Sequence, residues 1–312
     1  MPVGDSAMES QVIISFLTSV GSIIVADRAM LMVAAMTFGF FGFSRWVLKR
    51  DIVHARTIAS IMATLMIYVA NILFVPIIYY ANEPVRQAYQ WIGIPTIPAG
   101  IWAHMPGAAL TVIALLLYDL LMYWYHRFLH TTYAWPIHAI HHSDPDVNGF
   151  TTYRVHMLEG LLKVTFMILF FSWLGLPGDV LAATALFAVL LNAYVHFDVD
   201  WGHGPLRKII ASPRFHRWHH ADTPQFYGKN LANMFPFYDV MFGTYIDPGI
   251  CREPMGARGV PENDVVKLIA YPFTQWALML RQATARRQRQ APHTAQSPAS
   301  SRQDLPIVIE PG

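Results

Sequence analysis

The sequence contains little that would support thiol, phosphate or hydrolytic chemistry. Cys251 is the single cysteine among 312 residues, which excludes an internal disulfide and a thiolate metal site. The sequence has no glycine-rich phosphate loop, no serine or cysteine nucleophile motif and no internal repeat. Lysine and arginine number 22 against 20 acidic residues, so the net charge does not indicate nucleic-acid binding. These absences leave a metal site with nitrogen and oxygen ligands as the remaining kind of chemistry.

Charged residues are also scarce, at 13% of the chain against 54% hydrophobic residues. This composition is typical of a polytopic membrane protein rather than a soluble globular one. The first residues include Asp5 and Glu9 and lack a basic region, so no cleaved signal peptide is expected. The predicted fold is an all-α, integral membrane helical bundle with about four spans.

The apolar stretches place these spans along the chain. Residues 29–48 and 57–81 are the first two predicted spans. Residues 12–26 are expected to form an interfacial or re-entrant helix, because fifteen residues at about 1.5 Å each are shorter than a hydrocarbon core of about 30 Å. A third span starts near Gly107, and residues 158–197 form a helical hairpin that is broken around Pro177.

Basic residues indicate the orientation of the bundle. Arg45, Lys49, Arg50 and Arg56 surround the link between the first two spans, which predicts a cytoplasmic link. The loop at residues 82–106 is then expected on the opposite side. The C-terminus carries no retention signal, which favours a bacterial inner membrane over the endoplasmic reticulum.

Three histidine clusters are the main functional signal. Their members are three or four residues apart: His126 and His130; His138, His141 and His142; and His216, His219 and His220. On a helix these offsets place imidazoles on one face, where neighbours can share one metal ion or flank two. Eight imidazoles exceed the four ligands of a tetrahedral zinc, which favours two ions. The isolated His54, His104 and His293 are interpreted as non-ligands.

The order of these clusters resembles that of the fatty acid hydroxylase and sterol desaturase superfamily, over about residues 110–247. Four further segments carry the resemblance: Tyr123–Arg127 before the first cluster, Arg154–Glu159, Pro213–His220 and Phe242–Tyr245. The resemblance implies an integral membrane, non-haem diiron enzyme. Such enzymes use dioxygen and two electrons from a separate electron-transfer protein to hydroxylate, desaturate or oxidise a membrane lipid.

The resemblance also implies which residues bind the two irons. The expected ligands are nine histidines: His126, His130, His138, His141, His142, His196, His216, His219 and His220. Some relatives have another histidine four residues beyond the position of His196, where this sequence has Asp200. Asp200, the nearby His203 or a water molecule could therefore supply a tenth ligand, and the sequence leaves these alternatives open. All of these groups are expected to converge on the cytoplasmic face.

Three residues are candidates for supporting the ligands: Asp119, His156 and Glu159. Asp119 lies seven residues before His126, on the same helix face but about 10 Å deeper. It is therefore expected to orient a ligand from another helix or to pair with a buried arginine. Glu159 is expected either to accept an imidazole N–H or to act as a charge at a helix start.

The chain is predicted to contain three regions: an N-terminal membrane region at 1–106, a hydroxylase-like catalytic domain at 107–250, and an interfacial helix with a disordered basic tail at 251–312. Residues after Gly204, up to Tyr245, are expected to form a cap over the metal site. Residues 264–282 read as an amphipathic helix interrupted near Pro272, followed by the tail.

The predicted function is hydroxylation of a fatty acyl lipid or sterol-like substrate. A desaturase with the same site is the main alternative, because both reactions begin at an unactivated C–H bond. A metal transporter is a more distant alternative, since transporter ligands usually lie near the bilayer midplane. A structural zinc cage would explain histidine ligands but not their large number. The sequence identifies neither the substrate nor the electron donor.

Overall fold

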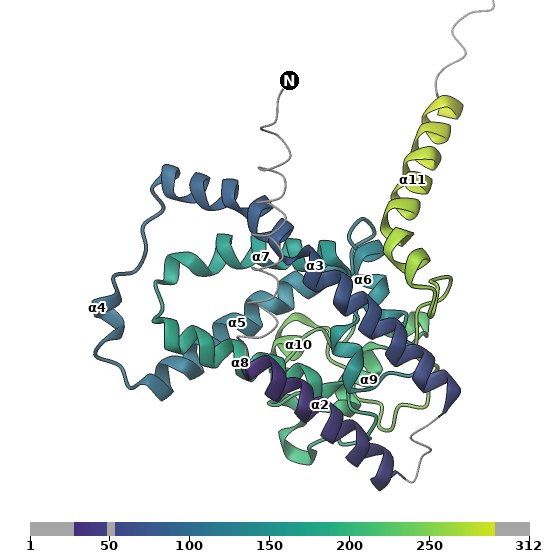
Figure 1. Ribbon diagram of the computed structural model, residues 1–312, viewed down its shortest axis with the longest axis horizontal. Helices are drawn as coiled ribbons and strands as arrows, with labels where there is room; N and C mark the ends of the chain where they lie inside the picture. The colour runs from purple at the N-terminus through teal and green to yellow at the C-terminus, as the bar shows by residue number, and fades with distance from the viewer. Residues whose placement is uncertain (1–27, 49–53, 291–312) are drawn as a thin grey trace, which may run out of the picture.

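The computed structural model describes residues 28–48 and 54–290 (Figure 1). This part of the chain is helical and contains no strand, which confirms the all-α fold class. The α-helices are α2 (Arg28–Val47), α3 (Ala55–Ile92), α4 (Ala99–Trp102), α5 (Gly107–Leu129), α6 (Trp135–His142), α7 (Met157–Phe171), α8 (Gly178–Val195), α9 (Pro213–His219), α10 (Phe237–Phe242) and α11 (Val265–Gln290). The predicted helix at residues 12–26 lies outside the described residues.

Four helical segments of the described chain are long and apolar enough to cross a membrane: Ala55–Ile92, Gly107–Leu129, Met157–Leu174 and Gly178–Val195. The protein is therefore an integral membrane helical bundle with the predicted number of spans. The set of spans differs from the prediction in one respect. The stretch predicted as a span at residues 29–48 forms α2 but is not one of these four segments. The two arms of the hairpin instead count as two of them.

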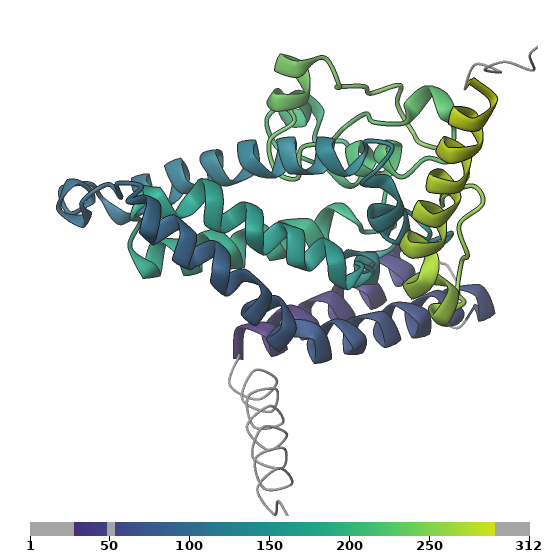
Figure 2. The same cartoon turned by 90° about the horizontal axis from the view of Figure 1, so that it is seen from above.

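The second predicted span is longer than expected. Helix α3 runs for 38 residues to Ile92, so residues 82–92 are helical and the expected loop at 82–106 begins only at Gly93. Pro76 and Pro84 lie inside the helix. Proline can bend a long helix without ending it, and Figure 2 shows α3 changing direction part-way along its length. The helix ends at Gly93, whose φ of 71° suits glycine.

The predicted break in the hairpin is confirmed. Between α7 and α8 the chain turns at Gly175, where φ is 56° and an added Cβ would collide with the carbonyl oxygen of Ile97. The backbone N–H of Ile97 donates to Trp173 O at 2.8 Å, which ties the α4 loop to the turn. A buried apolar cluster then packs this turn against the start of α5: Leu110, Ala114, Phe171, Leu174, Leu176 and Val180. This packing fixes the end of the bundle far from the histidines.

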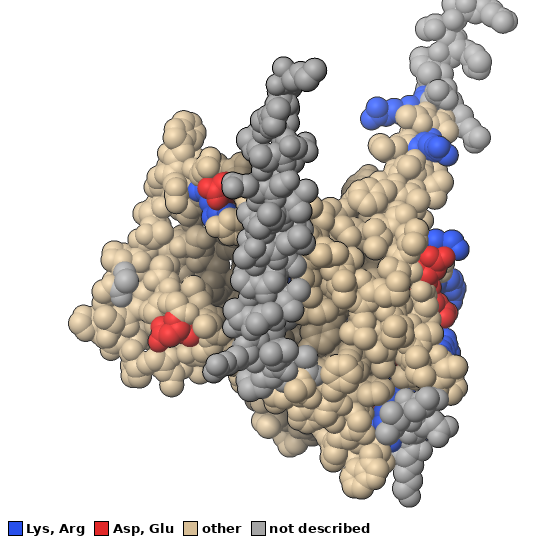
Figure 3. Space-filling view, viewed as in Figure 1, with Lys and Arg blue, Asp and Glu red and all other residues tan. Residues whose placement is uncertain are grey.

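The C-terminal helix also corrects the sequence prediction. Helix α11 continues through Pro272 to Gln290, so Arg281, Arg286 and Arg287 are helical rather than part of a disordered tail. Pro272 is the eighth residue of the helix, and its missing N–H removes one backbone hydrogen bond without ending the helix. Figure 3 shows basic side chains toward the outer end of this helix.

Candidate metal centre

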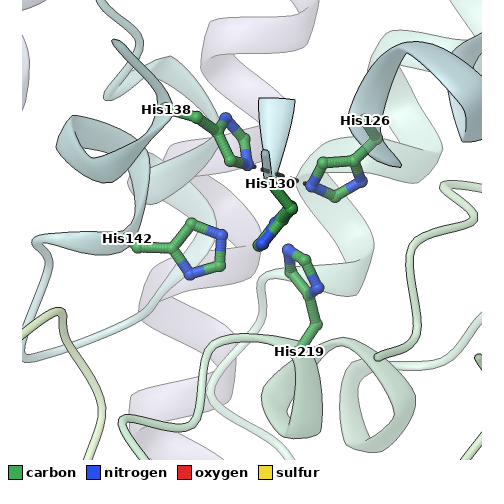
Figure 4. A group of neighbouring side chains, drawn as sticks. All are labelled: His126, His130, His138, His142 and His219. Carbon is green, nitrogen blue, oxygen red and sulfur yellow. Dashed lines mark hydrogen bonds between the residues drawn. The ribbon is translucent and has the colours of Figure 1, made fainter. Parts of the chain in front are cut away.

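The structure brings together all nine histidines that the sequence singled out. They fall into two groups, within each of which one nitrogen per residue lies within 4.8 Å of the others. The five-histidine group is His126, His130, His138, His142 and His219, and the four-histidine group is His141, His196, His216 and His220. Figure 4 shows the five rings of the first group directed toward a common point.

The helix offsets explain how each cluster is divided. Residues four apart differ by about 40° around a helix axis, whereas residues three apart differ by about 60° in the other direction. Each pair four residues apart stays in one group, as His138 and His142 do, while the intervening His141 joins the other group. The third cluster repeats this division in reverse, with His219 alone in the five-histidine group. Each H-x-x-H-H cluster thus flanks both groups.

Backbone carbonyls orient several of the rings. Three imidazoles donate Nδ1–H at 2.6 to 2.8 Å: His126 to Leu231 O, His219 to Lys229 O and His196 to Asn192 O. A ring whose Nδ1 carries the hydrogen presents an unprotonated Nε2 on its opposite side. The Nε2 atoms of these rings therefore have a lone pair available for a metal ion.

The inward-facing nitrogens are crowded and lack ordinary partners. Nε2 of His216 lies 2.9 Å from Nε2 of His196, and Nε2 of His126 lies 3.0 Å from Nε2 of His138. Buried nitrogens without any hydrogen-bond partner in the described chain include Nε2 of His130, His142 and His219. Two nitrogens bound to one ion at about 2.1 Å each are at most about 4.2 Å apart. The residues present therefore fit metal ions with nitrogen ligands.

Burial keeps several of these imidazoles neutral. Desolvation lowers the pKa of His219 to about 3 and that of His196 to about 4. It also holds the pKa of His141 and of His220 well below the usual value, with neighbouring imidazoles adding to the effect. Neutral imidazole is the form that binds metal. Near neutral pH the rings are thus ready to act as ligands.

Glu159 supports a ring of the five-histidine group. Its Oε2 lies 3.1 Å from Nδ1 of His138, and both side chains are buried. A carboxylate in this position accepts the Nδ1–H, fixes the ring and increases the basicity of Nε2. Of the two sequence alternatives, the structure shows Glu159 in contact with a ring.

Asp119 has a different role from either one predicted. Within the described part of the chain its carboxylate forms no hydrogen bond with a histidine or an arginine. It accepts backbone N–H groups of Asn233, Met234 and Phe235 at 2.7 to 3.2 Å. The geometric reason is its depth on α5, which places it opposite this loop rather than opposite a ring. Asp119 therefore anchors the loop whose Leu231 carbonyl orients His126.

Asp239 is a supporting residue that the sequence analysis missed. It accepts the N–H groups of Leu231 and Ala232 at 2.7 and 2.9 Å and the hydroxyl of Thr244 at 2.6 Å. Together with Asp119 it holds both ends of the loop at residues 231–235. The available signal was its position three residues before the Phe242–Tyr245 segment.

Comparison with known proteins places these residues in a family. The family model described as fatty acid hydroxylase matches residues 111–244, a segment that contains all nine histidines. This segment of the chain, rather than its whole length, is what resembles the fatty acid hydroxylase family. No solved structure matches the chain significantly.

Several curated members of the superfamily are similar in sequence. An ornithine lipid hydroxylase of Rhizobium tropici is 29% identical over 54% of this chain and 52% of its own length. Alkylglycerol monooxygenases of Danio rerio and Homo sapiens are each 33% identical, over 43% and 39% of this chain and 30% and 27% of their own lengths. The chain thus spans about half of the first relative and less than a third of the others.

Three residues suggested by the superfamily resemblance lie away from the two groups. His156 caps the start of α7 by accepting the N–H of Leu158 at Nδ1, and its Nε2 donates to Ile269 O of α11. It therefore joins two helices rather than supporting a ring. Asp200 forms an ion pair with Arg214 at 2.8 Å. His203 lies 2.6 Å from the hydroxyl of Tyr194, and neither Asp200 nor His203 belongs to a described metal group.

Two cavities reach the nine histidines from different sides. The inner cavity, of about 140 Å³, is lined by parts of α5, α7 and α8 and by two histidines of each group: His126, His138, His141 and His216. The cap cavity, of about 460 Å³, reaches only the five-histidine group, through His130, His142 and His219. The cap cavity is larger, but of these two cavities only the inner one is lined by histidines of both groups.

Proposed function

We propose that this protein is a membrane-bound diiron hydroxylase that inserts one atom of dioxygen into a membrane lipid. The observation that carries the proposal is the arrangement of nine imidazoles, eight of them buried and that of His130 partly buried, in two adjacent groups at the end of apolar membrane helices. Nitrogen ligands suit iron as well as zinc. The two groups would each hold one iron, and all nine histidines would act as ligands.

Bound iron would supply the redox chemistry that activates dioxygen against an unactivated C–H bond. The chain's own residues hold the imidazoles neutral, orient His138 through Glu159 and His126 through the Leu231 carbonyl, and keep water from the buried groups. The inner cavity would hold the reacting carbon, because within it a substrate faces both groups.

The relatives favour hydroxylation. The names of the similar proteins describe an ornithine lipid hydroxylase and alkylglycerol monooxygenases, and each of these activities adds oxygen to a lipid. A desaturase with the same site is the second candidate, because removal of hydrogen from a C–H bond begins both reactions. The location of the histidine groups at the ends of α5 and α8, rather than along a path through the bundle, does not favour a transporter.

The electrons would come from a separate electron-transfer protein. We place its approach at the cap cavity, which opens beside His130, His142 and His219 without crossing the bilayer-spanning helices. A donor bound there would be close to the five-histidine group while leaving the inner cavity free for lipid.

We propose a bacterial inner membrane location with the histidine groups on the cytoplasmic face. The bacterial relative and the basic residues near Arg45 and Arg56 support it. Reporter fusions after Asn148 and after Arg302 should both report the cytoplasm. Signals from opposite sides of the membrane would contradict this topology.

Labelled dioxygen tests the reaction. Purified protein loaded with iron and supplied with a chemical or protein reductant should convert a lipid extract to a product that carries one ¹⁸O atom from ¹⁸O₂, measured by mass spectrometry. A product with an unlabelled double bond would assign the protein to the desaturases. Label taken only from H₂¹⁸O would exclude an oxygenase.

A further inference from the structure

A lysine on a membrane-spanning segment is unexplained by the site described so far. Glu159 and Lys163 are the charged residues of the segment Met157–Leu174. Glu159 contacts His138, but Lys163 contacts no histidine ring. Charged side chains within spans are costly and generally mark a functional position.

Lys163 stands at the opening of the inner cavity. It lines that cavity together with histidines of both groups, yet its side chain is exposed. It lies four residues beyond Glu159, about 6 Å further along the axis of α7 and away from the histidines. The side chain of Tyr118 on α5 hydrogen-bonds with it, and among the described residues no carboxylate forms an ion pair with its ammonium. A positive charge therefore marks the way into the cavity.

The size of the cavity limits what lies between Lys163 and the metal groups. A volume of about 140 Å³ has room for about five groups the size of a water molecule or methylene. A membrane lipid is much larger, so most of it must remain outside, past Lys163. The atoms that pass the ammonium are then only a few bonds from the atoms that face the histidines.

We propose that Lys163 binds an anionic group of the lipid, a carboxylate or a phosphate, and so selects lipids that are oxidised within about five bonds of that group. A charge-assisted hydrogen bond at a poorly hydrated site is stronger than one in water. This gives the lysine a role that an apolar residue on the same face could not fill. The inference rests on the proposed function, because it assumes that the inner cavity holds the substrate.

Lipid binding tests the proposal without turnover. The full-length protein, purified with its metal, reconstituted in phosphatidylcholine nanodiscs and kept under argon, is titrated with three radiolabelled lipids of one acyl chain: oleate, lysophosphatidic acid and monooleoylglycerol. Lys163→Met should weaken binding of at least one anionic lipid about tenfold and leave the neutral monooleoylglycerol unchanged. Whether oleate or lysophosphatidic acid loses more identifies the group as a carboxylate or a phosphate.

Two matched variants complete the test. Lys163→Arg keeps the charge and should retain much of the preference for the anionic lipid. Lys267→Met removes an exposed lysine of α11 that pairs with Asp264, and should change nothing. Equal weakening of all three lipids by Lys163→Met, or no weakening, would overturn the proposal, and the second result would indicate a lysine that only extends toward lipid head groups.

The binding measurement also separates this inference from the proposed function. It needs neither dioxygen nor electrons. An equal effect of Lys163→Met on all three lipids, or no effect, therefore refutes the role of Lys163 while leaving the oxygenase reaction open. Intact selectivity in a protein that transfers no ¹⁸O to any lipid would instead refute the proposed function.

Discussion

Replacing Glu159 should weaken the binding of one metal ion and leave the binding of the other unchanged. Glu159 contacts His138, a member of the five-histidine group, and no member of the four-histidine group. Glu159→Gln keeps a neutral acceptor near Nδ1 of His138, whereas Glu159→Ala removes the acceptor altogether. Substitution of such a carboxylate typically costs 10- to 100-fold in metal affinity. We expect about tenfold for Gln and about 100-fold for Ala, which correspond to about 1.4 and 2.7 kcal/mol.

The assay is removal of iron by graded chelator. The protein is dialysed against a chelator series and the iron per chain is measured by mass spectrometry of the metal. In the wild-type protein both irons should resist chelation over a similar range. In Glu159→Gln one of the two should leave at about tenfold lower chelator concentration, while the other is retained as before.

The control is Glu83→Gln, which changes a partly exposed glutamate on α3 that pairs with Arg86. It should leave both transitions in place. A variant of Glu159 that loses both irons together, or neither, would refute the assignment of the carboxylate to a single group. A misfolded variant is recognised by its elution as an aggregate and is excluded from the comparison.

Replacing single histidines should distinguish clustered from isolated residues: His219→Ala is expected to lose iron from one group, whereas His54→Ala retains two irons per chain. Asp119→Asn leaves one acceptor oxygen for three buried N–H groups and should lower the free energy of unfolding by about 2 kcal/mol, measured by denaturation in detergent. The exposed Asp179→Asn should cost much less. Acid should destabilise the metal-free protein. The pKa of His196 falls from about 6.5 unfolded to about 4 folded, so the unfolded state binds more protons between these values and stability drops as pH decreases. From pH 6.5 to 5 this residue alone contributes about 2 kcal/mol, and a flat thermal midpoint over that range would contradict a neutral, buried ring.

The order and spacing of the histidines singled out eight of them, the family resemblance added His196, and the structure places all nine in two adjacent groups. Because imidazoles four residues apart share a helix face, the sequence alone indicated that each cluster forms a compact unit. The offsets also separate the third ring of each H-x-x-H-H cluster from the pair, but they do not show which rings of the different clusters meet, since that depends on how α6 and α9 face each other. The meeting of His138 and His142 with His219, and of His141 with His216 and His220, is a tertiary result.

The ends of the helices were likewise determined partly by local sequence and partly by tertiary packing. Pro177 and Gly175 ended the hairpin arms where local chemistry required it. Pro76 and Pro272 did not end α3 or α11. A proline removes one N–H and bends a helix, but packing on either side decides whether the helix continues.

The supporting residues Asp119 and Asp239 show most clearly the difference between what the sequence determined and what the tertiary structure decided. A carboxylate seven residues from a ligand was visible in the sequence, yet its partners were the backbone N–H groups of residues 233–235, more than a hundred positions away. Backbone donors carry no sequence signal, so the roles of Asp119 and Asp239 were decided only when α5 and the loop came together. The sequence determined the membrane class, the number of spans and the histidines available for metal. The tertiary structure decided their grouping, their orientation and the placement of Lys163 beside them, because each depends on contacts between helices that local periodicity does not encode.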